Sequence, residues 1–122
     1  MFRSPAIASD GTIYITIANM NGQDDGALLA LNEDGSFRWM YPPNPSTNPL
    51  GEVRSSPSIA ADGTVVFGSN TGASDDRSTL WAVNPDGTLR WKWADITGSP
   101  NVESKPAISQ SGMVYFLSLI HI

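Results

Sequence analysis

The sequence predicts an all-β fold made of repeated units, each containing four short antiparallel strands. The first observation behind this prediction is an internal repeat, in which Pro57 matches Pro5 and Trp91 matches Trp39, both 52 residues later. The second is that strand-like segments alternate with turn formers along the whole chain, which has 11 Gly and 9 Pro. The third is that no segment shows the spacing of apolar residues that is typical of a helix.

Each unit contains four candidate strands in the same order. The first is PAIA or PSIA, and the Asp-Gly pair that follows predicts a hairpin turn, because glycine accepts the positive φ that such turns need. The second, TIYITI or TVVFG, is rich in β-branched and aromatic residues. A polar loop leads to the third, LLALN or LWAVN, and a tight NEDG or NPDG turn leads to the fourth, SFRWMY or TLRWKW.

The fourth strand is expected to alternate between two faces, because successive side chains of a strand point in opposite directions. The apolar face is predicted to carry Phe37, Trp39 and Tyr41 in the first unit and Leu89, Trp91 and Trp93 in the second. The opposite face is predicted to carry the basic residues Arg38, Arg90 and Lys92.

The repeat divides the chain into segments. Residues 1–53 form the first unit with a proline-rich connection at 41–53, residues 54–103 form the second, and 104–116 begin a third. The last segment, LSLIHI at 117–122, breaks the repeat and resembles the translated end of a transposon-derived sequencing adaptor. We therefore expect a non-native tail there, the alternative being an ordinary apolar edge strand.

Four antiparallel strands in a repeat of about 50 residues are typical of a β-propeller blade. A single blade cannot bury both of its faces, so Trp39 and Trp91 are predicted to pack between adjacent blades. Ala30 and Ala82 are small enough to allow close approach at the same place. Propellers close with roughly four to eight blades, so we expect an incomplete ring whose uncovered faces invite association.

Two segments, ALNEDGSFRW and AVNPDGTLRW, resemble the quinoprotein (pyrroloquinoline quinone-like) β-propeller repeat, and the resemblance covers nearly the whole chain. The tryptophan-docking motif of that family runs Ala, any residue, Asp, two of any, Thr-Gly, three of any, Trp. Its main places are filled here by Ala30 and Ala82, Gly35 and Gly87, and Trp39 and Trp91. The departures are Asn32 and Asn84 in place of the family's Asp, and a turn that is one residue shorter.

The resemblance implies a fragment of a secreted or periplasmic propeller that acts as a non-catalytic binding or scaffolding module. Its expected partners are proteins, bound through the propeller surface, and further blades of the same parent protein. The alternative is a fragment of a quinone- and calcium-dependent alcohol or sugar dehydrogenase. Such enzymes hold their cofactor with residues from all blades and often with a vicinal disulfide, whereas this chain has no cysteine. No catalytic, cofactor-binding or metal residue is therefore assigned, and no cofactor is expected.

Composition excludes several other classes of function. The net charge is −5 and the seven basic residues are scattered, which argues against a nucleic-acid partner because phosphate binding needs clustered Lys and Arg. No apolar run approaches the roughly 20 residues that a membrane-spanning helix needs.

Few residues are candidates for chemistry. His121 is the only histidine, and it lies in the suspect tail. The acidic loops resemble calcium loops only loosely, since the glutamate that an EF-hand needs is missing, and we interpret them as ordinary loops. Their polar residues are Asn19, Asn21, Asp24 and Asp25 in the first unit and Asp75 and Asp76 in the second.

The three glutamates, Glu33, Glu52 and Glu103, show no pairing that indicates glycoside chemistry. The aromatic pairs Trp39/Tyr41 and Trp91/Trp93 have the character of sugar-stacking platforms, but their regular placement on a repeated strand favours packing between blades.

Overall fold

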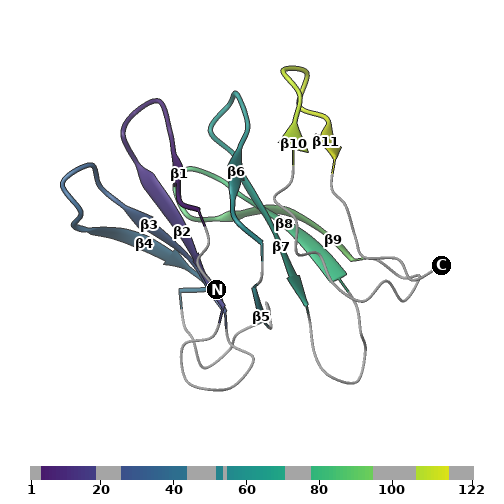
Figure 1. Cartoon of the computed structure of the whole chain (residues 1–122), viewed down its shortest axis with the longest axis horizontal. Helices are drawn as coiled ribbons and strands as arrows, with labels where there is room; N and C mark the ends of the chain where they lie inside the picture. The colour runs from purple at the N-terminus through teal and green to yellow at the C-terminus, as the bar shows by residue number, and fades with distance from the viewer. Residues whose placement is uncertain are drawn as a thin grey trace.

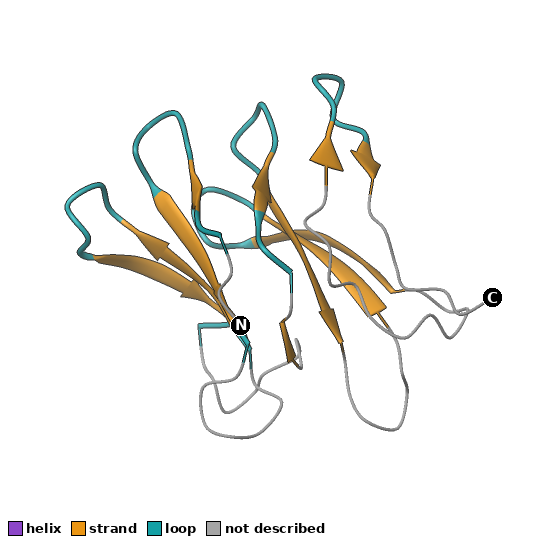
Figure 2. Cartoon of the chain, in the orientation of Figure 1, coloured by secondary structure: helices purple, strands orange, loops and turns teal. Residues whose placement is uncertain are grey.

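The structure is a computed structural model that describes residues 4–18, 26–43, 52–53, 55–70, 78–94 and 107–115. All regular elements in these ranges are β-strands, and they form antiparallel sheets with no closed barrel among them (Figure 2). This confirms the predicted all-β class. The strands are β1 (Ala6–Ile7), β2 (Ile13–Ile17), β3 (Ala27–Leu31), β4 (Phe37–Tyr41), β5 (Glu52–Val53), β6 (Ser58–Ile59), β7 (Val65–Asn70), β8 (Ser78–Val83), β9 (Leu89–Ala94), β10 (Ala107–Ile108) and β11 (Val114–Tyr115).

The first sheet contains β1, β2, β3 and β4 side by side in chain order. Tyr14 pairs with Ala6 on one side and with Ala30 on the other, and Ala30 pairs in turn with Trp39. Because cross-strand partners lie on the same face of a sheet, these four residues belong to one face. That face is buried at Ala6, Tyr14 and Ala30, so the alternating pattern of the sequence does produce an inward side.

The second sheet repeats this order with β7, β8 and β9, while β5 and β6 both pair with the outer edge of β7. Ser55 lies between the two short strands and its hydroxyl accepts a hydrogen bond of 2.6 Å from the Gly68 N–H. The β5 and β6 strands therefore act as one interrupted edge strand. The pairing of Val66 with Ala82, and of Ala82 with Trp91, reproduces the first sheet 52 residues later.

The Asp-Gly pairs make the hairpin turns that the sequence predicts. Gly11, Gly35, Gly63 and Gly87 have φ between 89° and 92°, a region that residues with a side chain rarely adopt. In the β3–β4 turn the Asp34 carboxylate accepts hydrogen bonds from the Ser36 N–H at 2.9 Å and the Ser36 hydroxyl at 2.6 Å. The Asn32 amide donates to the same hydroxyl at 3.0 Å, which explains an Asn at this motif position.

The two sheets lie next to each other (Figure 1). Tyr14 and Leu28 of the first sheet and Phe67 and Trp81 of the second belong to one buried cluster. The Tyr41 and Trp81 rings lie 6.2 Å apart between centroids. Full burial of each such side chain stabilises the fold by about 1.5–3 kcal/mol. A hydrogen bond of 2.8 Å from the Thr16 hydroxyl to the Ser55 carbonyl also joins the two sheets.

The β10–β11 pair, called here the third hairpin, lies on the side of the second sheet that faces away from the first sheet. The first sheet, the second sheet and the third hairpin therefore follow one another across Figure 1. Its Ile108 packs against a smaller buried cluster of Val66, Leu80 and Ala82. Its turn has Gly112 at φ 88° and matches the earlier hairpin turns.

The predicted alternation of the fourth strands is wrong at the first residues of each strand. The register shifts between Ala30 and Leu31, so that Phe37 pairs with Leu31. Phe37 therefore lies on the opposite face of the sheet from Trp39. Leu89 likewise pairs with Val83, away from Trp91. These β-bulges also change the face on which the arginines lie. Arg90 lines the same cavity as Trp91 and is therefore not on the opposite face from it. Lys92 does lie on the opposite face, with Nζ 5.5 Å from the centroid of the Trp81 ring.

Several predictions lie outside the described residues. They concern the acidic loops with Asn19, Asn21, Asp24, Asp25, Asp75 and Asp76, most of the 41–53 connection, Glu103, and the tail 117–122 with His121. The proposed boundaries at 53, 103 and 116 stay predictions.

Two equivalent glycines test the contact between the sheets. A methyl group on Gly87 would approach the Trp39 ring to 3.0 Å, whereas one on Gly35 would meet nothing within 4 Å. Gly35→Ala should lose about 1–2 kcal/mol of unfolding free energy for the positive φ alone. Gly87→Ala should lose clearly more, because it also displaces the indole ring. Urea unfolding of both variants in dilute protein measures the difference, and equal losses would contradict the contact.

Candidate functional site

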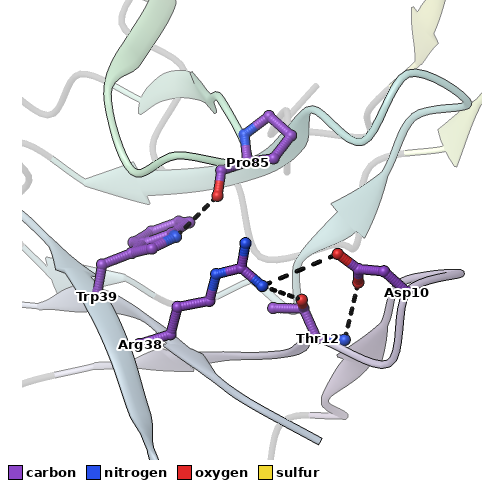
Figure 3. A network of polar contacts seen from close by, with 5 residues as sticks. All are labelled: Asp10, Thr12, Arg38, Trp39 and Pro85. Carbon is purple, nitrogen blue, oxygen red and sulfur yellow. Dashed lines mark hydrogen bonds and ion pairs between the residues drawn. The ribbon is translucent and has the colours of Figure 1, made fainter.

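The best-defined contact between the two sheets is made by Trp39 (Figure 3). Its indole N–H donates a hydrogen bond of 2.9 Å to the carbonyl oxygen of Pro85, in the β8–β9 turn of the second sheet. The ring lies against Gly87 of that turn, where only a residue without a side chain fits. Tyr14 supports the indole from within the first sheet at 5.7 Å between centroids. The predicted packing of Trp39 between two units is thus confirmed.

Arg38 lies beside Trp39 and belongs to the same contact region (Figure 3). Its guanidinium donates a hydrogen bond of 2.9 Å to the Thr12 hydroxyl and lies 3.9 Å from the Asp10 carboxylate. Asp10 in turn accepts a hydrogen bond from the Thr12 N–H at 2.9 Å. The arginine therefore ties the β1–β2 turn to the fourth strand, next to the docked indole.

Trp91 occupies the equivalent position in the second sheet but is 37% exposed and has no hydrogen-bond partner among the described residues. It borders a cavity of about 380 Å³ between the second sheet and the third hairpin. The cavity is lined by Ala60, Ala61, Asp62, Thr64, Val66, Arg90, Trp91, Ile108, Gln110, Ser111 and Gly112. This cavity is the candidate functional site.

The cavity combines apolar and polar groups. Val66 and Ile108 supply an apolar wall, and the Trp91 ring supplies a flat aromatic surface. Arg90 lies 3.3 Å from the Asp62 carboxylate, so these two charges neutralise each other. Among the described residues, the buried Thr64 hydroxyl makes no hydrogen bond of good geometry, although it lies close enough to the Asp62 carboxylate to lower the pKa of that group. Thr12, at the equivalent position of the first sheet, accepts a hydrogen bond from Arg38. Such a site favours binding of a group that offers a flat face to the indole and a polar atom to its rim.

The aspartates of the hairpin turns are committed to their own turns. The pKa of Asp62 is lowered from its ordinary value of 3.8, first by the hydrogen bond from the Thr64 N–H, next by the Thr64 hydroxyl and to a smaller extent by Arg90. The pKa of Asp34 is lowered by its hydrogen bonds from Ser36, and that of Asp86 by those from Thr88. These carboxylates stay ionised near neutral pH and hold the turns, which does not suit a general acid.

The described residues do not form a metal centre, since no three His, Cys, Asp or Glu side chains among them gather as metal ligands. A calcium ion that holds a quinone needs converging oxygen donors. The described aspartates instead direct their oxygens into their own turns, so they do not fit such a group. Glu33 is exposed on the β3–β4 turn, beside Gly11.

The two aromatic pairs differ in their exposure. Trp39 and Tyr41 are half-buried between the sheets, whereas Trp91 is 37% and Trp93 50% exposed. Sequence reasoning did not single out Gln110 or Ser111, which complete the cavity opposite Trp91. The signal that points to them is the alignment of the third unit with the earlier hairpins, in which Ser111 takes the place of Asp62.

No protein-family model matches the chain, and no curated protein matches it either. No helix long and apolar enough to cross a membrane occurs in the described part of the chain.

The turn aspartates predict how stability depends on pH. Their pKa values are lower in the folded protein than the ordinary 3.8, so the stability they contribute is complete above that value. It is lost as the pH falls through the lower folded values, that is, below about 4. Urea unfolding at a series of pH values should show this decline. It should persist in high salt, because hydrogen bonds from Ser36 and Thr88 cause the shifts of Asp34 and Asp86.

The double variant Asp34→Asn/Asp86→Asn should flatten part of this decline, since the amide oxygen still accepts the turn hydrogen bonds but does not titrate. An unchanged pH profile in the double variant would show that these two turns do not contribute.

Proposed function

We propose that this chain is part of a quinoprotein-like β-propeller and serves as a non-catalytic module that binds or scaffolds other proteins. Each four-stranded sheet is one blade in this proposal, and the Trp39 contact is the packing of one blade on the next. The proposal includes a secreted or periplasmic location, in keeping with the family resemblance.

The observation that carries the binding role is the exposed Trp91 in its cavity. Trp39 shows what the same residue does when it is covered, since it donates to the Pro85 carbonyl and lies on Gly87. The protein group that suits Trp91 is therefore a tight β-turn with a free carbonyl and a glycine. A turn of this kind offers both the polar atom and the flat face that the cavity accommodates.

The turn aspartates support a binding role over a catalytic one. Asp10, Asp34, Asp62 and Asp86 all have pKa values lowered by hydrogen bonds from their own turns. A general acid near neutral pH requires a shift in the opposite direction. In this proposal the turns give a fixed shape to the surface and take no part in proton transfer.

A labelled cyclic hairpin peptide that carries the NPDG turn of residues 84–87 tests the binding role. We expect it to bind the full chain, with Trp91→Ala weakening the affinity by about tenfold or more. Fluorescence anisotropy measures the binding. The matched control is the same peptide with valine in place of Gly87, which should not bind because its side chain would collide with the indole. Equal affinity of both peptides would contradict the proposed mode of binding.

An activity assay tests the non-catalytic part of the proposal. The chain is incubated with pyrroloquinoline quinone and calcium and assayed for dye reduction with alcohols and sugars. We expect no turnover above that of the free quinone, and substrate-dependent turnover by the protein would overturn the proposal.

A further inference from the structure

Four hairpin turns in the described part of the chain contain an Asp-Gly pair, and the aspartate of each pair is exposed to solvent. An Asp-Gly pair is the most reactive dipeptide for one covalent change of the backbone, because glycine has no side chain to hinder attack by its own nitrogen. Each of these turns is therefore a candidate modification site. The four pairs are Asp10-Gly11, Asp34-Gly35, Asp62-Gly63 and Asp86-Gly87.

The covalent change converts aspartate into isoaspartate. The glycine nitrogen attacks the side-chain carbonyl carbon of the protonated aspartic acid and loses its proton, while the carboxyl group loses its hydroxyl. The proton and the hydroxyl leave as water, and a five-membered succinimide ring remains. Water then adds to the backbone carbonyl carbon of the ring and breaks its bond to the nitrogen. The chain now runs through the former side chain, and no oxidant or other reactant is consumed.

The folded turns withhold the nitrogen that this reaction needs. The Gly35 N–H donates a hydrogen bond of 2.9 Å to the Asn32 carbonyl. In the other three turns the glycine N–H likewise donates to the carbonyl three residues earlier, at 2.9 or 3.0 Å. The φ of 89° to 92° at these glycines holds the peptide group in this direction. Closure of the succinimide ring would therefore break a hydrogen bond in every turn.

The turns also hold the carboxyl group in its unreactive form. Asp34 Oδ1 accepts hydrogen bonds from the N–H and the hydroxyl of Ser36, at 2.9 and 2.6 Å. Asp86 Oδ1 accepts the same pair from Thr88, at 3.0 and 2.6 Å. Such bonds favour the carboxylate, whereas ring closure needs the protonated acid because a hydroxyl group must leave. Rotation of the carboxylate toward the glycine nitrogen would also break both bonds.

We propose that these four Asp-Gly turns are isoaspartate sites that are closed in the folded chain and become reactive only when the turn opens. The rate of modification then follows the population of the open turn. The closure rests on hydrogen bonds within each turn and does not depend on the proposed binding role.

The modification has a structural consequence. Isoaspartate adds one carbon atom to the backbone and carries its carboxylate directly on the Cα atom. The carboxylate is then no longer placed to accept from the residue two positions later, as Asp34 accepts from Ser36. A turn that is modified while open cannot re-form with its original bonds, so that a reversible unfolding event becomes permanent.

Removal of one hydroxyl at a time tests the proposal in the full chain. Ser36→Ala deletes the 2.6 Å bond to Asp34, and Thr88→Ala deletes the equivalent bond to Asp86. The matched controls are Ser36→Thr and Thr88→Ser, which exchange the two residue types and keep both hydroxyls. Each protein is incubated near neutral pH with and without urea, and circular dichroism checks that it is folded without urea. Peptide mapping with electron-transfer mass spectrometry measures isoaspartate at each turn.

We expect isoaspartate to form at all four turns at least about tenfold more slowly in the folded chain than in urea. Ser36→Ala should speed the reaction about tenfold at Asp34, because a hydrogen bond to a charged group is lost there, and should leave Asp86 unchanged. Thr88→Ala should do the reverse. The two controls should keep the slow rates.

Equal rates with and without urea in the unmodified chain would overturn the proposal, and this comparison decides it alone if an alanine variant is unfolded. A folded alanine variant with an unchanged rate at its own turn would also overturn it. So would a folded variant that speeds the reaction equally at all four turns, because the protection would then belong to the whole fold and not to each turn.

Discussion

A β-sheet that is apolar on both faces must be covered on both, and this constraint governs the structure. Phe67 and Trp81 are buried against the first sheet, and each contributes about 1.5–3 kcal/mol. The hydrogen bonds that cross between the sheets, such as the one from Thr16 to Ser55, contribute about 1 kcal/mol each. Burial therefore holds the sheets together, and the directional bonds decide how they are aligned.

Trp39 combines both effects in one residue, because its ring is packed on a neighbouring turn while its N–H is bonded to the same turn. The cavity at Trp91 presents the same side chain without the cover. The Trp39 contact and the candidate site at Trp91 thus use the same kind of surface, which is covered at Trp39 and exposed at Trp91. This connection is the reason that the proposed function is one of binding, and it needs no chemistry from the aspartates that hold the turns.

Much of this arrangement follows from local patterns in the sequence. The Asp-Gly turns, the strand order and the place of Trp39 were all predictable, because turn chemistry and alternation act over a few residues. The bulge that turns Arg38 beside Trp39 was not, since a register shift depends on the partner strand. Nor was the cavity, because Trp91 and Gln110 meet only through the placement of the third hairpin on the second sheet.

The exact spacing between equivalent residues has a consequence for how such a chain can evolve. Val65 and Trp81 of the second sheet pack on the first, and their counterparts Ile13 and Leu29 lie on the outer face of the first sheet. A duplicated gene segment that encodes one unit would therefore keep its strands and turns in register with those of its neighbour. The core side chains would still have to change in size, because Phe67 and Trp81 stand where the first unit has Ile15 and Leu29. A deletion inside a strand would instead shift every later side chain of that strand to the other face.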